Sequence, residues 1–197
     1  MMDDVKNKKA RIGSLEAILK NHSHFYAGVK SVLQEADRLG GIIGAVSEKL
    51  SFDPHYQTAL EIALGASSQH IIVEDEQAAT QAIEFLKRKR TGRATFLPLT
   101  TIKARHLPDH HRVIIEKSTG FLGLASSLVR YDMSLEHIFQ NLLGTTAIFD
   151  TVENARAAAR KVRYQVRIVT LDGTELRTGG SYAGGAHRNN NTIFIKP

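Results

Sequence analysis

The segment that most constrains the fold of this 197-residue chain lies near its C-terminus, where the glycine pairs Gly179-Gly180 and Gly184-Gly185 flank Tyr182. Residues 166–171, just upstream, form a β-branched run typical of a buried strand, and Asp172-Gly173 predicts a turn after it. Glycine permits positive φ and lets another backbone approach where a Cβ would collide. Paired glycines beside a strong strand therefore predict close contact with a phosphate, a helix or another chain.

Three interpretations of this segment are open. Gly179 and Gly184 have the G-x-x-x-x-G spacing of a phosphate-binding loop, but Gly185 and Ala186 stand where that loop requires Lys and Ser/Thr. The dinucleotide pattern G-x-G-x-x-G is absent from the segment as well. A flexible turn is the second interpretation, and a close backbone contact is the third. The residues favour a close backbone contact, so we expect this segment to form an interface.

Composition limits the class of protein. The chain is 42% hydrophobic and has no apolar run approaching 18 residues, so we expect a soluble globular protein without a membrane span. It has no cysteine, which excludes disulfides and thiolate metal sites and fits a reducing cytoplasm. A formal net charge of +6 and a pI near 9.6 favour a polyanionic partner.

Residues 12–39 predict an amphipathic helix, or two joined ones, with the seam of a coiled coil. The seam residues recur at spacings of three and four: Ile12, Leu15, Leu19, His22, Tyr26, Val29, Leu33 and Ala36. No second stretch of this kind follows before Pro197, so we expect the returning helix to lie beyond the chain's end. The alternative is a helix that packs on its own globular domain.

The rest of the chain alternates short strands with helices, and the second half repeats the rhythm of the first. The predicted strands are 42–46, 70–73, 93–97, 113–115, 145–149 and 166–171. The predicted helices are 56–64, 77–89, 135–143 and 152–161, and a linker rich in basic residues and histidine spans 100–112. This pattern predicts an α+β fold with two small subdomains, each a sheet with flanking helices. Their predicted bounds are 40–112 and 113–197, after a coiled-coil stub at 1–39.

No catalytic constellation is present in the sequence. The patterns G-x-S-x-G and H-E-x-x-H are both absent, and a cysteine nucleophile is impossible. The nine histidines are best interpreted as solvated loop residues, because no cysteine is available to complete a zinc site. We therefore expect no enzyme activity, no cofactor and no bound metal.

Two basic clusters are candidates for contact with nucleic acid. The first is Lys87, Arg88, Lys89, Arg90 and Arg93, and the second is Arg156, Arg160, Lys161, Arg163 and Arg167. Each is interpreted equally well as a solvated face or as a polyanion site. Few aromatic residues lie between them, so contact would be with the phosphate backbone and not by base stacking. Further basic residues near the predicted coiled-coil root are Lys30, Arg38, Arg188 and Lys196.

Several stretches, in order and spacing, resemble the hinge domain of bacterial structural maintenance of chromosomes (SMC) proteins, over roughly residues 25–186. They are Phe25-Tyr-Ala-Gly-Val-Lys-Ser-Val-Leu33, Gly44-Ala-Val46, Tyr56 to Asp75, Phe85-Leu-Lys87, Gly92-Arg-Ala-Thr-Phe-Leu-Pro-Leu99, Asn141-Leu-Leu-Gly144, Val169-Thr-Leu-Asp-Gly173 and Gly179-Gly-Ser-Tyr-Ala-Gly-Gly185. Two departures stand out. Tyr182-Ala183 replaces a common Met-Thr pair, and the family's long outgoing helix does not follow Ala186.

The resemblance implies a homodimer in which two hinges form a two-fold ring and join two coiled-coil arms of a chromosome condensation and segregation ATPase. It implies that the dimer interface contains Gly179, Gly180, Tyr182, Gly184 and Gly185. It also implies weak DNA binding without sequence preference, for which the candidates are Lys87, Arg88, Lys89, Arg90, Arg93, Arg156, Arg160, Lys161 and Arg163. ATP and kleisin-type partners would bind head domains absent from this chain, and the protein would be cytoplasmic and nucleoid-associated.

Two other classes stay open on the residues alone. One is a small nucleotide-binding α/β enzyme that uses the loop from Gly179 to Gly185. The other is a nucleic-acid-binding module that stays monomeric.

Overall fold

The computed structural model describes residues 25–186, which form two compact units. Within the described range, the first unit comprises 25–45 and 69–98, and the second comprises 46–68 and 99–186. The chain therefore passes from one unit to the other three times. This division differs from the two consecutive subdomains that the sequence predicts.

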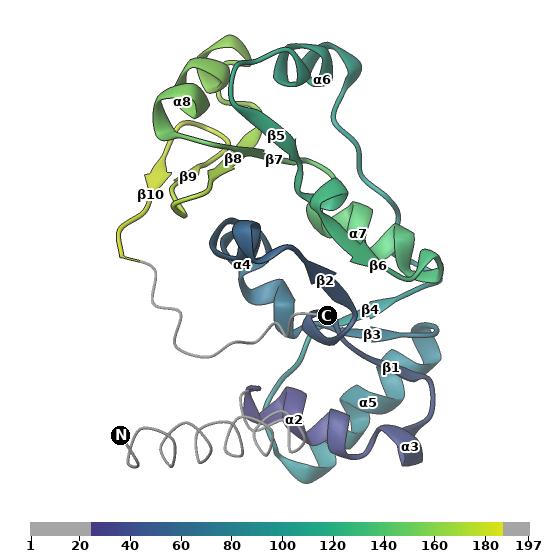
Figure 1. Cartoon of the computed structure of the whole chain (residues 1–197). Helices are drawn as coiled ribbons and strands as arrows, with labels where there is room; N and C mark the ends of the chain where they lie inside the picture. Colours follow the sequence, from purple (N-terminus) through teal and green to yellow (C-terminus); the bar gives the residue numbers. More distant parts are fainter. Residues whose placement is uncertain (1–24, 187–197) are drawn as a thin grey trace, which may run out of the picture. The chain divides into compact units, whose positions relative to one another are not determined.

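The first unit contains a three-stranded sheet in the order β1-β3-β4, covered by helices (Figure 1). Its strands are β1 (Ile42–Ala45), β3 (Ile71–Val73) and β4 (Phe96–Pro98), and its helices are α2 (Ala27–Gln34), α3 (Ala36–Leu39) and α5 (Glu76–Lys89). β1 is antiparallel to β3, and β4 is parallel to it. The apolar faces of α2 and α5 meet the sheet in one core that includes Val32, Ile71 and Ala82.

The second unit contains a five-stranded sheet in the order β10-β9-β8-β7-β5 and a separate two-stranded ribbon of β2 and β6. The strands of the larger sheet are β5 (Phe121–Leu124), β7 (Thr146–Phe149), β8 (Arg167–Thr170), β9 (Glu175–Leu176) and β10 (Tyr182–Ala183). The ribbon and the helices are β2 (Leu50–Phe52), β6 (Val129–Tyr131), α4 (Gln57–Leu64), α6 (Asp109–Glu116), α7 (Glu136–Leu143) and α8 (Val152–Lys161).

The ribbon explains why the units are discontinuous. β2 follows β1 in the chain, but it pairs with β6 through Leu50↔Tyr131 and Phe52↔Val129. This long-range pairing, followed by α4, places residues 46–68 in the second unit.

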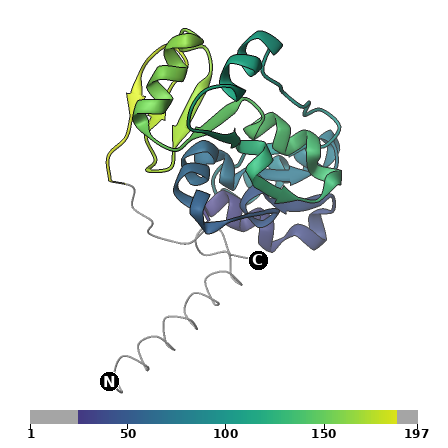
Figure 2. The ribbon, with the colours of Figure 1, turned by 45° about the horizontal axis from the view of Figure 1, so that its top comes forward.

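Side chains on neighbouring positions of β8 point to opposite faces of the larger sheet. Ile168 and Leu176 join a core with the alanines of α8 on one face. Arg167 donates hydrogen bonds to the carbonyls of Ile62 and Ala63 in α4, which lies on the other side of the strands in Figure 1. Figure 2 shows the green α8 beside the yellow hairpin of β9 and β10.

The predicted linker at 100–112 and the predicted strand at 113–115 are wrong in part, because α6 spans Asp109–Glu116. Arg112 pairs with Asp109 three residues before it and with Glu116 four residues after it, a spacing that stabilises a helix. The β-branched run Val113-Ile114-Ile115 looks like a strand, yet only Ile115 of the three is fully buried.

The predicted N-terminal helix lies largely outside the described residues, as do its seam positions from Ile12 to His22. The described part is α2 and α3, which are separated at Glu35. Val29 and Val32 of α2 are buried in the core of the first unit. For this part, the alternative in which the helix packs on its own domain holds.

The repeated rhythm that the sequence predicts is a duplication of structure. The series β1, β2, α4, β3, α5, β4 recurs as β5, β6, α7, β7, α8, β8, and its first three members recur after 79 residues (42 to 121, 50 to 129, 57 to 136). Both β1 and β5 have an irregular register at a glycine, Gly44 at φ 148° and Gly123 at φ 152°. In both series the last two strands are parallel neighbours, so β4 is the counterpart of β8.

Candidate docking edge and basic surfaces

The glycine segment forms the turn and outer strand of a β-hairpin. The Arg177 amide donates to the Ser181 carbonyl at 2.8 Å, and the Gly180 amide donates to the Arg177 carbonyl at 3.0 Å. β10 pairs only with β9 among the described residues, so its outer edge is open. No helix follows this turn within the described range, whereas a phosphate-binding loop leads into a helix N-terminus. The hairpin is therefore suited to strand pairing and not to holding a phosphate.

The four glycines of the segment differ in whether the fold of one chain requires a glycine at that position. Gly179, Gly180 and Gly185 have φ values of 97°, 105° and 136°, a region that side chains rarely adopt. Gly184 has no such φ, and a Cβ built on it would lie 3.4 Å from Thr174 Oγ1, in ordinary contact. The fold of one chain thus explains three of these glycines, but it does not explain Gly184.

A shallow cavity of about 270 Å³ borders the segment on the α4 face of the sheet. It is lined by Ile62, Gly173, Glu175, Arg177, Ala183, Gly184, Gly185 and Ala186. The cavity adjoins the open edge of β10, and part of its wall is backbone without side chains.

An ion cluster around one buried carboxylate stabilises the hairpin on the α4 face of the sheet. Glu175, only 9% exposed, accepts hydrogen bonds from Arg167 Nε at 2.6 Å and Arg177 Nε at 2.9 Å. Burial raises the pKa of Glu175, but the hydrogen bonds from Arg177 and Arg167 outweigh it, so the pKa lies below its ordinary value. Arg167 belongs to the second basic cluster in sequence, but the structure uses it to join β8, β9 and α4.

The first unit has an open edge of its own. β4 pairs only with β3 within the described residues. Its counterpart β8 carries the antiparallel strand β9, with Ile168 opposite Leu176 and Val169 opposite Glu175. By the duplication, the corresponding positions on β4 are Phe96 and Leu97, where no strand of the described chain is paired on the outer side.

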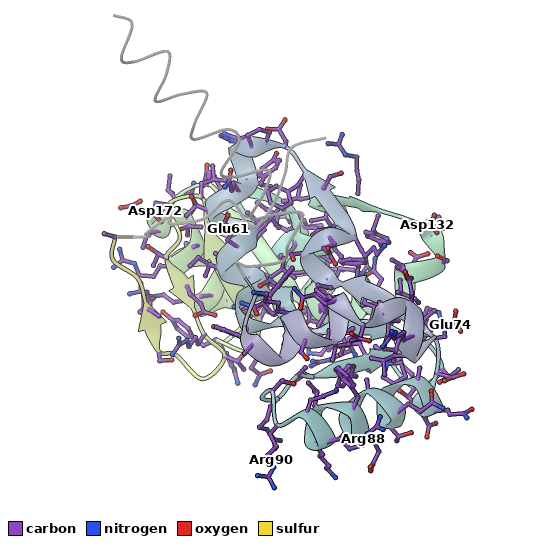
Figure 3. All side chains as sticks on the ribbon, turned by 90° about the horizontal axis from the view of Figure 1, so that it is seen from below. Glu61, Glu74, Arg88, Arg90, Asp132 and Asp172 are labelled. Carbon is purple, nitrogen blue, oxygen red and sulfur yellow. The ribbon has the colours of Figure 1, made fainter. Side chains whose placement is uncertain are left out.

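The predicted basic residues are exposed in both units. Lys87, Arg88 and Lys89 occupy the last turn of α5, where cations favour the helix dipole. Figure 3 shows Arg90 extending away from the ribbon at this end of α5. The full set of exposed basic side chains is Lys87, Arg88, Lys89, Arg90, Arg93, Arg156, Arg160, Lys161 and Arg163.

Within residues 25–186, none of these nine basic side chains forms an ion pair with a carboxylate. Five lie in the first unit and four in the second. Exposed cations without a carboxylate partner are free to bind a phosphate backbone.

Sequence reasoning missed Tyr164, which contacts the glycine segment in three ways. Its hydroxyl lies 2.7 Å from the hydroxyl of Tyr182, its carbonyl accepts from the Gly179 amide at 2.9 Å, and its ring lies beside Gly180. The hydrogen bond with Tyr164 raises the pKa of Tyr182, burial adds to this, and the charges of Arg156 and Arg160 oppose it. No motif marks Tyr164 in the sequence, because its role depends on the fold around it.

In the described part of the chain, no helix is long and apolar enough to cross a membrane, and no group of three His, Cys, Asp or Glu residues is arranged to hold a metal ion.

A duplicated α+β series with an open, glycine-lined hairpin defines the class of fold. Residues 39–159, more than half of the chain, match the family described as "SMC proteins Flexible Hinge Domain". The chain therefore belongs to the SMC hinge family, and the predicted family and fold class are confirmed.

The known proteins with similar sequences or structures are SMC proteins or their hinge domains. Over 191 residues the chain is 44% identical to the "Chromosome partition protein Smc" of Bacillus subtilis, covering 97% of this chain and 16% of that protein. An asymmetric dimer of the Geobacillus stearothermophilus SMC hinge domain is 41% identical, with a TM-score of 0.86, and covers 95% of this chain and 77% of its own. The Pyrococcus furiosus SMC hinge domain is 31% identical, with a TM-score of 0.69 and coverages of 90% and 88%. The chain spans about one sixth of the length of the curated relative.

Proposed function

We propose that this chain is the homodimerisation hinge of a chromosome condensation and segregation ATPase, joining two coiled-coil arms into a ring. The Geobacillus relative is a dimer of hinge domains, and the curated relatives are chromosome partition proteins. The hinge itself carries no catalysis. ATP hydrolysis and kleisin-type partners belong to head domains elsewhere in the full-length, cytoplasmic, nucleoid-associated protein.

Docking joins the open edge of β10 in one copy to the open edge of β4 in the other. β9 pairs with Ile168 and Val169 of β8, so by analogy the partner's strand lies opposite their counterparts on β4, Phe96 and Leu97. Pairing of open strand edges uses main-chain hydrogen bonds, so it requires little from side chains except that they leave room. Each copy offers both edges, so a two-fold arrangement repeats the contact and closes a ring.

Gly184 is the observation that carries this proposal. Its φ and its surroundings within one chain both tolerate a methyl group. A partner backbone passing close to β10 supplies a reason for glycine at this position. The remaining interface residues, Gly179, Gly180, Tyr182 and Gly185, are held in the same hairpin.

The experiment is Gly184→Ala, measured by sedimentation equilibrium and thermal unfolding. We expect the dimer dissociation constant to rise about tenfold or more, because a steric loss of ~1.4 kcal/mol changes affinity tenfold and the contact occurs twice. The melting temperature of the monomer should change little.

Gly40→Ala is the matched control, since a Cβ there meets nothing within 4 Å and Gly40 lies outside β10. Its positive φ of 74° lowers stability on substitution, but dimerisation should persist. An unchanged dissociation constant for Gly184→Ala would contradict the proposed pairing of β10 with the partner copy.

A second proposed activity is weak binding of DNA without sequence preference. The nine exposed basic side chains without a carboxylate partner in the described structure support it, as does the net charge of +6. The residues in the first unit are Lys87, Arg88, Lys89, Arg90 and Arg93, and those in the second are Arg156, Arg160, Lys161 and Arg163.

A further inference from the structure

The end of α8 has an unusual backbone. Arg163 and Tyr164, two consecutive residues other than glycine, have φ values of 54° and 57° in the left-handed region. The Tyr164 amide donates to the Ala159 carbonyl at 2.8 Å, which closes the helix in the manner of a C-terminal cap. One left-handed residue is enough for such a cap, and it is usually glycine.

The duplication provides an internal comparison. α5, the counterpart of α8, ends with a single left-handed residue, Arg90 at φ 51°, and a glycine follows at position 92. A helix end in this fold therefore needs no second strained residue with a side chain. Left-handed backbone at a bulky residue costs free energy and persists where surrounding contacts compensate for it.

Besides the capping bond to Ala159 and its packing on the core, Tyr164 makes three contacts with the hairpin. Its carbonyl receives the Gly179 amide, its ring lies beside Gly180, and its hydroxyl meets the hydroxyl of Tyr182. Tyr182 stands on β10 opposite Leu176, so its side chain is on the α8 face of the sheet. β10 is only two residues long, and its backbone pairing alone gives it little stability.

We propose that Tyr164 is the positioning residue of the docking edge, which is the open edge of β10. It fixes the β9–β10 hairpin through the hydrogen bond between its hydroxyl and that of Tyr182, a pair that we call the clasp. This inference rests on the proposed function, because it assigns the hairpin to dimerisation. The clasp orders the edge before a partner arrives, so less conformational entropy is lost on docking.

The test uses Tyr164→Phe, Tyr182→Phe and the double variant. Each single change removes one hydroxyl of the clasp and keeps the ring. Amide hydrogen exchange is followed at Arg177 and Gly179. The Arg177 amide donates to Ser181 within the hairpin, and the Gly179 amide donates to the Tyr164 carbonyl. Exchange is recorded at several protein concentrations, so that protection by a partner is separated from protection by the clasp.

We expect exchange to become about three- to tenfold faster in either single variant, as loss of one hydrogen bond predicts. The double variant should lose no more protection from exchange than a single variant, because both hydroxyls belong to the same hydrogen bond. The dimer dissociation constant should rise by a similar factor. In alkaline absorbance titration, the raised pKa of Tyr182 should fall toward the ordinary value in Tyr164→Phe, because the hydrogen bond that raises it is gone.

Tyr131→Phe is the matched control, since its hydroxyl accepts a hydrogen bond from Gln140 at 3.2 Å elsewhere in the same unit. Its hairpin exchange should stay at the wild-type rate. Additive losses in the double variant, unchanged exchange, or faster exchange without weaker dimerisation would each overturn the proposal. If the wild-type chain is monomeric, the proposed function fails, while the exchange and titration results still decide whether the clasp exists.

Discussion

At the scale of single residues, a side chain's chemistry is decided by its partners. Arg167 and Arg163 look alike in sequence, as members of one basic cluster. In the structure Arg167 is paired with Glu175 and bonded to α4, whereas Arg163 is exposed and has no carboxylate partner among the described residues. The bonds from Arg167 to α4 join residues more than 100 positions apart, so the sequence could not predict this part of the distinction.

Glu175→Gln tests the ion cluster. The pKa of Glu175 in the folded protein lies below its ordinary value, so the stabilisation is complete above the ordinary value and is lost as the pH falls through the folded pKa. Removing the charge leaves the partly exposed Arg167 with its carbonyl acceptors but without its carboxylate, and we expect the free energy of unfolding at neutral pH to fall by about 2 kcal/mol. The loss of stability on acidification should also be smaller than in the wild type. Urea unfolding at a series of pH values measures both.

Glu116→Gln is the control for this prediction, because its pair with Arg112 is on the surface. Exposed pairs contribute about 0–1 kcal/mol, so little change is expected. An acid profile of Glu175→Gln identical to the wild type would contradict the assigned role of Glu175.

At the scale of elements, the sequence predicted helices and strands well where a local signal existed. Asp75 accepts a hydrogen bond from the Ala78 amide at 2.8 Å, and Thr151 caps α8 through the Asn154 amide, both at predicted helix starts. α6 was missed because its apolar run looks like a strand, although the ion pairs of Arg112 at spacings of three and four fit a helix.

The two halves of the duplication share few identical residues. At an offset of 79 residues the identical pairs are Gly44 and Gly123, Ser47 and Ser126, Asp53 and Asp132, Leu64 and Leu143, and Gly65 and Gly144. They mark shared local geometry: Asp53 and Asp132 each accept a hydrogen bond from the amide two residues on, at 2.9 Å. Five identities among 24 aligned positions (42–65 against 121–144) give only a weak repeat signal without the structure.

The cap of α5 gives a prediction for one element. Asp75→Ala should lower the free energy of unfolding by about 1 kcal/mol, because the Ala78 amide loses its acceptor at the helix N-terminus. Gln81→Ala, on an exposed position of the same helix, should change it by less than about 0.5 kcal/mol. Chemical denaturation distinguishes the two variants, and equal effects would show that Asp75 has no capping role.

The basic ends of α5 and α8 are tested by the salt dependence of DNA binding. Neutralising Arg88 and Lys89 together, or Arg156 and Arg160 together, should weaken binding to duplex DNA and lower the slope of log K against log salt by about 1.8, if both side chains contact phosphates. Fluorescence anisotropy with a labelled DNA of arbitrary sequence measures the slope.

Arg112→Gln is the comparison for both pairs, because Asp109 and Glu116 already neutralise this arginine. Its slope should stay close to the wild type. A pair whose neutralisation leaves affinity and slope unchanged is a solvated face and not a DNA contact.

At the scale of the whole molecule, chain order is a poor guide to the division into units. The sequence predicts boundaries at 39, the end of the coiled-coil stub, and at 112, the end of the basic linker. The contacts instead place 46–68 with 99–186, because β2 pairs with β6 far along the chain. A local pattern predicts that a segment is a strand, but it does not identify which distant strand will pair with it.

The central claim is that the open edges of two copies pair and close a ring. Sedimentation equilibrium of the wild-type chain at micromolar concentration tests it most directly. The account predicts a single species of twice the 21.8 kDa chain mass, which Gly184→Ala shifts toward the monomer. A well-folded wild-type chain that stays at 21.8 kDa at every concentration accessible to the instrument would contradict it.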